Sequence, residues 1–229
     1  MVKKILKILK KIFIYLFVFH LVYLLYVWIF PPPFTLTMVG SLLRGEGVTK
    51  DYIALEEAGK QAPLAVIAAE DQQFPNHFGF DLKGIQAAIE YNDKESGRIR
   101  GGSTISQQVA KNVFLWQGRT WLRKGLEAYC TLWMELLYSK RRILELYLNV
   151  AEMGEGIYGI EAAAQHYFKK SAKNLTAAEA AKIAACLPAP RRYNVNPASK
   201  YVVRRSNWIQ RQMRNIGGEP SVQALLVNK

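Results

Sequence analysis

Residues 12–30 constrain this chain most strongly, because they are almost wholly apolar and aromatic. About 19 residues at about 1.5 Å each match a hydrocarbon core of about 30 Å, so the run predicts one transmembrane helix. Five lysines precede the run and three prolines follow it: Lys3, Lys4, Lys7, Lys10 and Lys11, then Pro31, Pro32 and Pro33. The positive-inside bias places the amino terminus in the cytoplasm and the rest of the chain outside.

A cleaved signal peptide is the alternative interpretation of this run. The apolar stretch is longer than an ordinary signal core, and no small-residue cleavage site follows it, so we favour a retained anchor. The sequence of 229 residues then divides into four parts. These are a basic cytoplasmic tail (1–11), the transmembrane helix (12–30), a linker (31–50) and one periplasmic domain (51–229).

Charge narrows the class of partner without deciding it. The chain has 31 Lys and Arg against 18 Asp and Glu. Such a surplus suits nucleic acid, anionic lipid or phosphate-bearing substrates.

The residues after the span follow mainly helical patterns. Helices are predicted at 64–73, 82 to about 92, 103–116, 121–138, 140–151, 159–168 and 176–187. Asp81 is expected to cap the second of these, and a capping box at Thr176 opens the last. β-rich segments are scarce, so the fold class is mainly α in one globular domain. A helix-like segment at 201–216 fits either packing on the core or lying on the membrane.

Cysteine and histidine usage gives no metal site. Cys130 and Cys186 fall in apolar helical patterns and are predicted to be buried free thiols, although a bridge between them is left open. No CxxC pattern occurs, and His20, His77 and His166 are scattered. We therefore expect no protein-ligated transition metal.

An acidic pair ends the first predicted helix of the domain. Glu70 follows Val66 and Ile67 at helical spacing, which turns its carboxylate toward the inward face. Desolvation raises the pKa of a carboxyl group and makes it a better base at neutral pH. The ordinary alternatives are that Glu70, as a helix-end acid, makes a surface salt bridge with a basic side chain, and that His77 makes a loop-bracing hydrogen bond.

A glycine-opened helix follows at Gly101-Gly102-Ser103. The glycines allow close backbone approach, Ser103 is predicted to cap the helix, and its first-turn amides are expected to attract phosphate. Thr104, Gln108 and Lys111 recur at helical spacing opposite an apolar stripe, which suits a pyrophosphate and its sugar. A solvated helix face explains the same pattern. Further on, Arg123 and Glu127 form either a helical ion pair or part of an anion-binding wall.

The ordered set of motifs decides between these interpretations. The motifs occupy 70–79, 101–112, 123–127 and 142–149, and further matches lie at 156–164 and 176–190. Together they resemble the lysozyme-like peptidoglycan glycosyltransferases of family 51 over about residues 60 to 215. The chain has neither Ser-x-x-Lys nor Lys-Thr-Gly, the motifs of the transpeptidase domain in bifunctional relatives, so it resembles the monofunctional type.

The resemblance implies a polymerising reaction. Glu70 would be the general base that takes a proton from the 4-hydroxyl of the terminal GlcNAc of an incoming lipid II. That oxygen attacks the anomeric carbon of the growing glycan, forming a β-1,4 linkage with inversion, and undecaprenyl pyrophosphate leaves. Glu127 matches a second acidic residue that orients either donor-site cations or the acceptor.

Other matched positions imply substrate binding. Basic side chains and a divalent cation, usually Mg²⁺ bridging the substrate diphosphate, would neutralise the leaving group. The charge-binding positions are Lys111, Arg119, Arg123 and Lys124. The further substrate-binding positions are Asp71, His77, Ser103, Thr104, Gln107, Gln108 and Asn112.

The resemblance also implies partners and a location. The partners are lipid II, the nascent glycan strand, membrane lipids and cell division or elongation proteins, with no nucleic acid. The location is the bacterial inner membrane, with the catalytic domain in the periplasm. Two rival functions are a membrane-anchored muramidase or lytic transglycosylase that cleaves glycan, and a non-enzymatic basic module that binds nucleic acid or anionic lipid.

Overall fold

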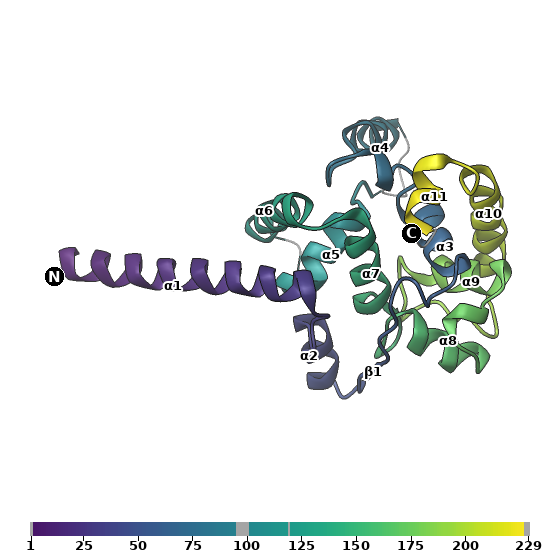
Figure 1. Cartoon of the computed structure of the whole chain (residues 1–229), viewed down its shortest axis with the longest axis horizontal. Coiled ribbons are helices and arrows are strands. Elements are labelled where there is room, and N and C mark those ends of the chain that lie inside the picture. The colour runs from purple at the N-terminus through teal and green to yellow at the C-terminus, as the bar shows by residue number, and fades with distance from the viewer. Residues whose placement is uncertain (1, 95–100, 119, 227–229) are drawn as a thin grey trace. The chain divides into compact units, whose positions relative to one another are not determined.

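The chain folds mainly into helices, as its patterns predict (Figure 1). The computed structural model describes residues 2–94, 101–118 and 120–226, and two units are distinguished, Met1–Pro33 and Phe34–Lys229. The first unit is one helix, α1 (Val2–Ile29), which is long and apolar enough to cross a membrane. It begins ten residues before the predicted span, so the basic tail continues the same helix.

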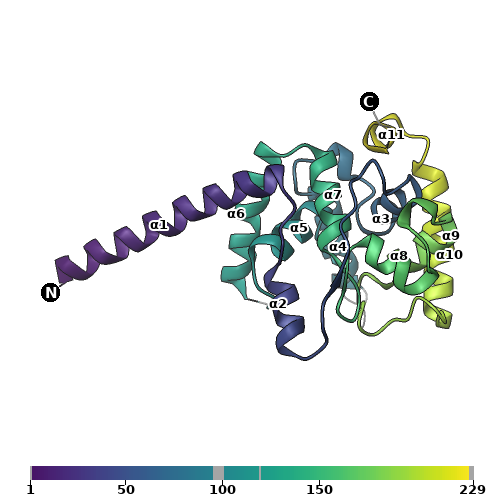
Figure 2. The ribbon, with the colours of Figure 1, turned by 60° about the horizontal axis from the view of Figure 1, so that its bottom comes forward.

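The second unit contains the remaining elements (Figure 2). Its helices are α2 (Leu36–Leu43), α3 (Gln61–Glu70), α4 (Leu82–Lys94), α5 (Ile105–Phe114), α6 (Trp121–Leu137), α7 (Lys140–Val150), α8 (Ile160–Phe168), α9 (Ala177–Cys186), α10 (Lys200–Ile216) and α11 (Pro220–Leu226). Short 3-10 turns lie at Phe74–Asn76 and Ala172–Asn174.

Helix α3 is the centre of one half of this unit. Residues 62–68 are all buried, because α9 and α10 both pack against α3. In the other half, α5 packs on α6 and α7. Figures 1 and 2 both show α7 at the side of this second half that lies next to α3. Glu70 therefore stands at the end of a largely buried helix, where it contacts α5 of the second half through Gln108.

The capping residues explain where several helices begin. Asp81 accepts a hydrogen bond from the Gly84 amide at 2.9 Å, and Thr176 forms the predicted capping box with Glu179, so both predictions are confirmed. Helix α3 ends at Glu70, three residues earlier than predicted. The cap of α5 is Thr104 rather than Ser103, so that prediction is wrong by one residue.

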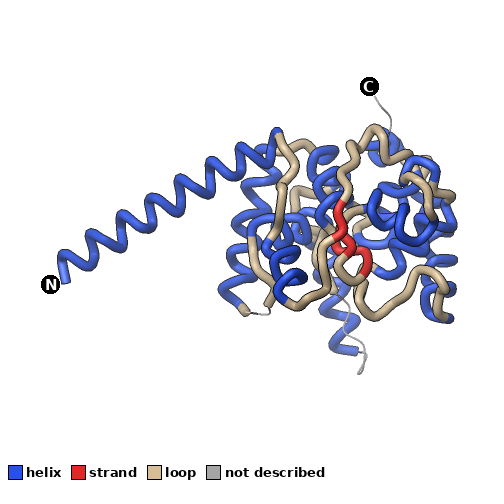
Figure 3. The backbone as a smooth tube through the Cα atoms, turned by 90° about the horizontal axis from the view of Figure 1, so that it is seen from below, coloured by secondary structure: helices blue, strands red, loops and turns tan. Residues whose placement is uncertain are grey.

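A small sheet joins the segment that was expected to be a linker to the second unit. Strands β1 (Thr49–Lys50), β3 (Ile157–Tyr158) and β2 (Glu152–Gly154) lie in that order, with β1 parallel and β2 antiparallel to β3 (Figure 3). Gly156 has φ of 66°, and a Cβ there would lie 2.8 Å from the Glu46 carbonyl oxygen, so the turn requires glycine. Residues 34–50 thus supply α2 and β1 to the folded unit.

The remaining expectations concern burial. Cys130 and Cys186 are both buried and free, as predicted. The apolar side of α10 is also buried: Val202, Ile209, Met213 and Ile216 pack inward. Of the two interpretations of this segment, packing on the core is the one that the structure confirms.

Candidate active site

Glu70 is partly buried and has a defined hydrogen-bond partner. The side-chain amide of Gln108, on α5, donates to Glu70 Oε2 at 2.7 Å. Burial raises the pKa of Glu70 above its usual value, and the charge of Asp71 acts in the same direction. The Gln108 hydrogen bond and the positive charges of Arg205 and Lys111 lower the pKa and so oppose this rise. The predicted raised pKa is therefore confirmed in direction, and its cause is desolvation.

Asp71, the residue after Glu70, connects neighbouring segments through hydrogen bonds. Its buried carboxylate contacts His77 Nε2 at 3.0 Å and accepts a hydrogen bond from the Ile105 amide at 3.1 Å. A carboxylate at the first turn of a helix is favoured by the helix dipole. Asp71 thus ties the segment after Glu70 to the start of α5, and His77 braces this loop as the ordinary interpretation predicts.

The start of α5 differs from the predicted phosphate cradle. Thr104 accepts from the Gln107 amide, and Gln107 Oε1 accepts from the Thr104 amide at 3.0 Å. The Ile105 amide already donates to Asp71. The amides of Thr104, Ile105 and Gln107 therefore already have protein partners and are not free to bind phosphate. Thr104 and Gln107 instead fix the helix start, and Thr104 Oγ1 also donates to the Gly79 carbonyl at 2.7 Å.

The positive charge of the site comes from side chains on α5 and α6. Glu127 is buried and receives Arg123 Nη1 at 2.5 Å on one oxygen and Lys124 Nζ on the other. Burial lowers the pKa of Lys111, and its neighbours are these same three charged groups together with Glu70. Three basic groups against one acidic group leave a net charge of +2 beside the base, counting Lys111, Arg123, Lys124 and Glu127. This cluster, here called the basic cluster, suits a dianionic group.

Lys111 and Gln108 connect the base to the basic cluster. They lie three residues apart on α5, so their side chains leave the same face of the helix. Ser103 Oγ lies 3.4 Å from Lys124 Nζ, which brings the residue before the α5 cap to the same cluster. The apolar stripe opposite, which contains Ile105, Val109 and Val113, is buried as predicted.

Two predicted residues stand apart from this arrangement. Asn112 accepts a hydrogen bond from Gln117 Nε2 at 3.3 Å, and the same nitrogen donates to Thr37 Oγ1 on α2 at 2.8 Å. Asn112 is thus part of the connection between α5 and α2. Arg119 lies outside the residues that the structure describes.

Sequence reasoning missed two residues that approach Glu70 from distant segments. Arg205, on α10, donates from Nη2 to the Ala69 carbonyl at 3.1 Å, in the last turn of α3. Tyr147, on α7, lies 3.3 Å from Gln108 Oε1. In the sequence, Arg205 is only a basic residue near the apolar side of an amphipathic helix. That pattern does not specify a contact with α3.

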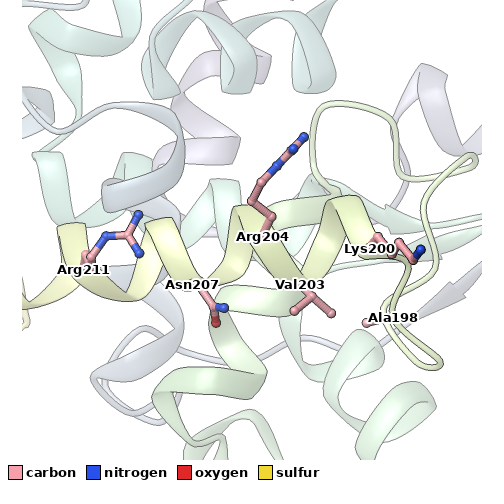
Figure 4. A pocket seen from close by; sticks show the side chains of 6 residues that line it. All are labelled: Ala198, Lys200, Val203, Arg204, Asn207 and Arg211. Carbon is pink, nitrogen blue, oxygen red and sulfur yellow. The ribbon is translucent and has the colours of Figure 1, made fainter.

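A separate hollow of about 450 Å³ runs along the outer side of α10 (Figure 4). Its lining residues are Ala198, Lys200, Val203, Arg204, Asn207 and Arg211. None of the predicted site residues lines it. The candidate active site is the region of Glu70 and the basic cluster, where the acid, its hydrogen-bond donor and the positive charges meet.

Comparison of the sequence with known proteins identifies the class of enzyme. A family model described as Transglycosylase matches residues 37–214. The chain belongs to the transglycosylase family. It is 54% identical over 203 residues to a biosynthetic peptidoglycan transglycosylase of Xanthomonas campestris pv. campestris strain B100, which covers 86% of this chain and 82% of the relative. It is 50% identical over 205 residues to a protein of the same name from Pectobacterium carotovorum subsp. carotovorum strain PC1, covering 86% and 84%.

Proposed function

We propose that the substrate of this peptidoglycan transglycosylase is lipid II, which it polymerises into glycan strands with release of undecaprenyl pyrophosphate. The observation that carries the proposal is a base with a raised pKa, Glu70, beside a basic cluster of net charge +2. A base suits the attacking sugar hydroxyl, and concentrated positive charge suits a departing diphosphate.

Each side chain has a role that follows from its contacts. Gln108 donates to Glu70 Oε2 and leaves the other carboxylate oxygen for the sugar hydroxyl. Glu127 holds Arg123 and Lys124 through both of its oxygens, so these two cations of the first turn of α6 are fixed before substrate arrives. Fixed charges need little reorganisation when negative charge develops on the leaving diphosphate. This arrangement favours orientation of donor-site cations as the role of Glu127.

The experiment compares two substrates with purified full-length protein. Fluorescent lipid II and preformed glycan strands are incubated separately with Mg²⁺, and products are separated by length on a gel. We expect polymer from lipid II and no shortening of the preformed strands. Shortening without polymerisation would support the lytic alternative, and binding without turnover would support a non-enzymatic module; either result would overturn the proposal.

We propose that the reaction uses Mg²⁺ and that the substrate diphosphate, rather than a site on the protein, would carry it. Among the described residues, no group of three His, Cys, Asp or Glu side chains gathers to hold a metal. Asp71 and Glu127, the acids nearest the base and the cations, are already engaged by protein donors. The chemistry that such an ion supplies is neutralisation of the diphosphate.

Removal of metal is therefore expected to affect activity but not folding. Excess EDTA should abolish polymerisation of lipid II, added Mg²⁺ should restore it, and the thermal unfolding temperature should stay unchanged throughout. The measurement is a pair of melting curves with and without EDTA beside the activity assay. A lower unfolding temperature in EDTA would show that the protein itself holds the ion.

We also propose that the amino terminus lies in the cytoplasm and that the catalytic unit lies at the outer face of the inner membrane. The support is the candidate membrane helix, whose amino-terminal part carries five lysines ahead of the apolar run. Both native cysteines are buried, so single cysteines introduced at exposed positions can report accessibility. In intact spheroplasts, a membrane-impermeant maleimide should label Glu155→Cys and not Lys4→Cys. The reverse labelling would contradict this orientation.

A further inference from the structure

The side-chain amide of Gln108 is held at both ends. Its nitrogen donates to Glu70 Oε2 at 2.7 Å, and its oxygen lies 3.3 Å from the hydroxyl of Tyr147, which donates to it. The three residues come from α3, α5 and α7 and form a short chain of hydrogen bonds that ends at the base. A rotation of the side-chain amide by half a turn about its bond to the rest of the side chain exchanges its donor and acceptor ends.

The turned orientation would be unfavourable for an ionised Glu70. It would place the amide oxygen against the carboxylate, so two acceptors would face each other without a proton between them. A hydroxyl donor at the far end of the amide favours the observed orientation, because it pairs with the amide oxygen there and leaves the amide nitrogen for the carboxylate. Tyr147 is in the right state for this role: it is only 1% exposed, and burial and the charge of Glu70 raise the pKa of its hydroxyl well above the usual value. It therefore remains protonated at neutral pH.

We propose that Tyr147 is a positioning residue for the reaction, which holds the Gln108 amide with its donor end toward Glu70 and so keeps the base ionised and aimed. Tyr147 contacts Gln108 and not the reacting atoms, so it acts through the amide. The inference rests on the proposed role of Glu70 as the base.

The other charged groups around Glu70 are unaffected by removal of the Tyr147 hydroxyl. Asp71 follows it on the same segment, Lys111 approaches from α5, and Arg205 approaches from α10. These three charges stay in place in Tyr147→Phe, which loses one oxygen atom. A change in the pH dependence of this variant would therefore come through the Gln108 amide.

The test is the pH profile of kcat/KM for lipid II polymerisation by the full chain. Without its locked donor, ionised Glu70 is less stabilised and its pKa rises, so less of the base is ionised at a given acidic pH. We expect the acid limb of Tyr147→Phe to move upward by about 0.5 pH unit or more, which lowers the rate on that limb by about threefold or more. Tyr158→Phe is the matched control. It also removes a buried hydroxyl, one that contacts Ser41 and the Thr37 carbonyl, and its profile should not move.

A double-mutant cycle separates action through Gln108 from general damage. Gln108→Leu alone should move the acid limb upward at least as far as Tyr147→Phe does, and it tests the inference even if Tyr147→Phe folds poorly. In the Gln108→Leu background, Tyr147→Phe should add no further shift. An unmoved acid limb in either single variant, or an equal added shift in the double variant, would overturn the inference. The proposed function has a separate test, because it fails only if the wild type does not polymerise lipid II or if Glu70→Gln still does.

Discussion

Glu70→Gln is expected to lose essentially all polymerising activity, a decrease of about 10²- to 10⁴-fold, which is the usual contribution of a general base. Glutamine keeps the size and one oxygen of the side chain but cannot take the proton of a sugar hydroxyl. The measurement is the rate of lipid II consumption at saturating substrate. Glu155→Gln is the control, because Glu155 is an exposed acid in the turn between β2 and β3, and it should retain wild-type activity.

The same substitution is expected to stabilise the fold at neutral pH. Burial raises the pKa of Glu70 in the folded state above its unfolded value, so the folded state binds this proton more tightly. Stability is then lost as the pH rises through the interval between the two pKa values. Glutamine stays neutral, so Glu70→Gln should unfold at a higher temperature than the wild type at neutral pH, and this gain should vanish below the unfolded pKa. A lower unfolding temperature at neutral pH would show that the ionised carboxylate stabilises the fold.

Glu127→Gln is expected to cause the second large loss, about 10²-fold or more in kcat, in the range seen when preorganised charge stabilisation is removed. Glu127 is the shared partner of Arg123 and Lys124, so without its charge the two cations repel each other and lose their fixed positions. The predicted effect falls on the step in which diphosphate leaves. Single-turnover kinetics with lipid II would measure it apart from substrate binding.

A second ion pair provides the control for this effect. Glu56→Gln removes the partner of Arg141, whose Nη2 lies 2.5 Å from Glu56 Oε1 at an exposed position. Exposed pairs contribute about 0 to 1 kcal/mol, so this variant should keep both its stability and its activity. Near-wild-type kcat in Glu127→Gln, with folding verified, would contradict the assignment of Glu127 to cation orientation.

Local patterns predicted the helical architecture well. The apolar periodicity located the helices, and the capping residues Asp81 and Thr176 gave correct starts because these hydrogen bonds are made within three residues. The inward position of Glu70 followed from Val66 and Ile67 for the same reason. Such features depend on neighbours along the chain, which the sequence displays directly.

Contacts between distant segments were harder to predict. The amides at the start of α5 were expected to bind phosphate, but Asp71, 34 residues earlier, occupies the Ile105 amide. The contacts of Arg205 with Ala69 and of Tyr147 with Gln108 likewise depend on how α10 and α7 pack. Residues 34–50 look like a linker because their elements are short and gain their partners from distant segments such as α5, α8 and β3. No spacing rule in one sequence reports these pairings.

The central claim is that Glu70 is the base at a site that releases a lipid-linked diphosphate. The most direct measurement incubates the wild type and Glu70→Gln in parallel with fluorescent lipid II and resolves the products by length. The account predicts a ladder of glycan polymers from the wild type, and unchanged lipid II from a Glu70→Gln protein whose melting curve shows it to be folded. Polymers from both proteins would contradict it.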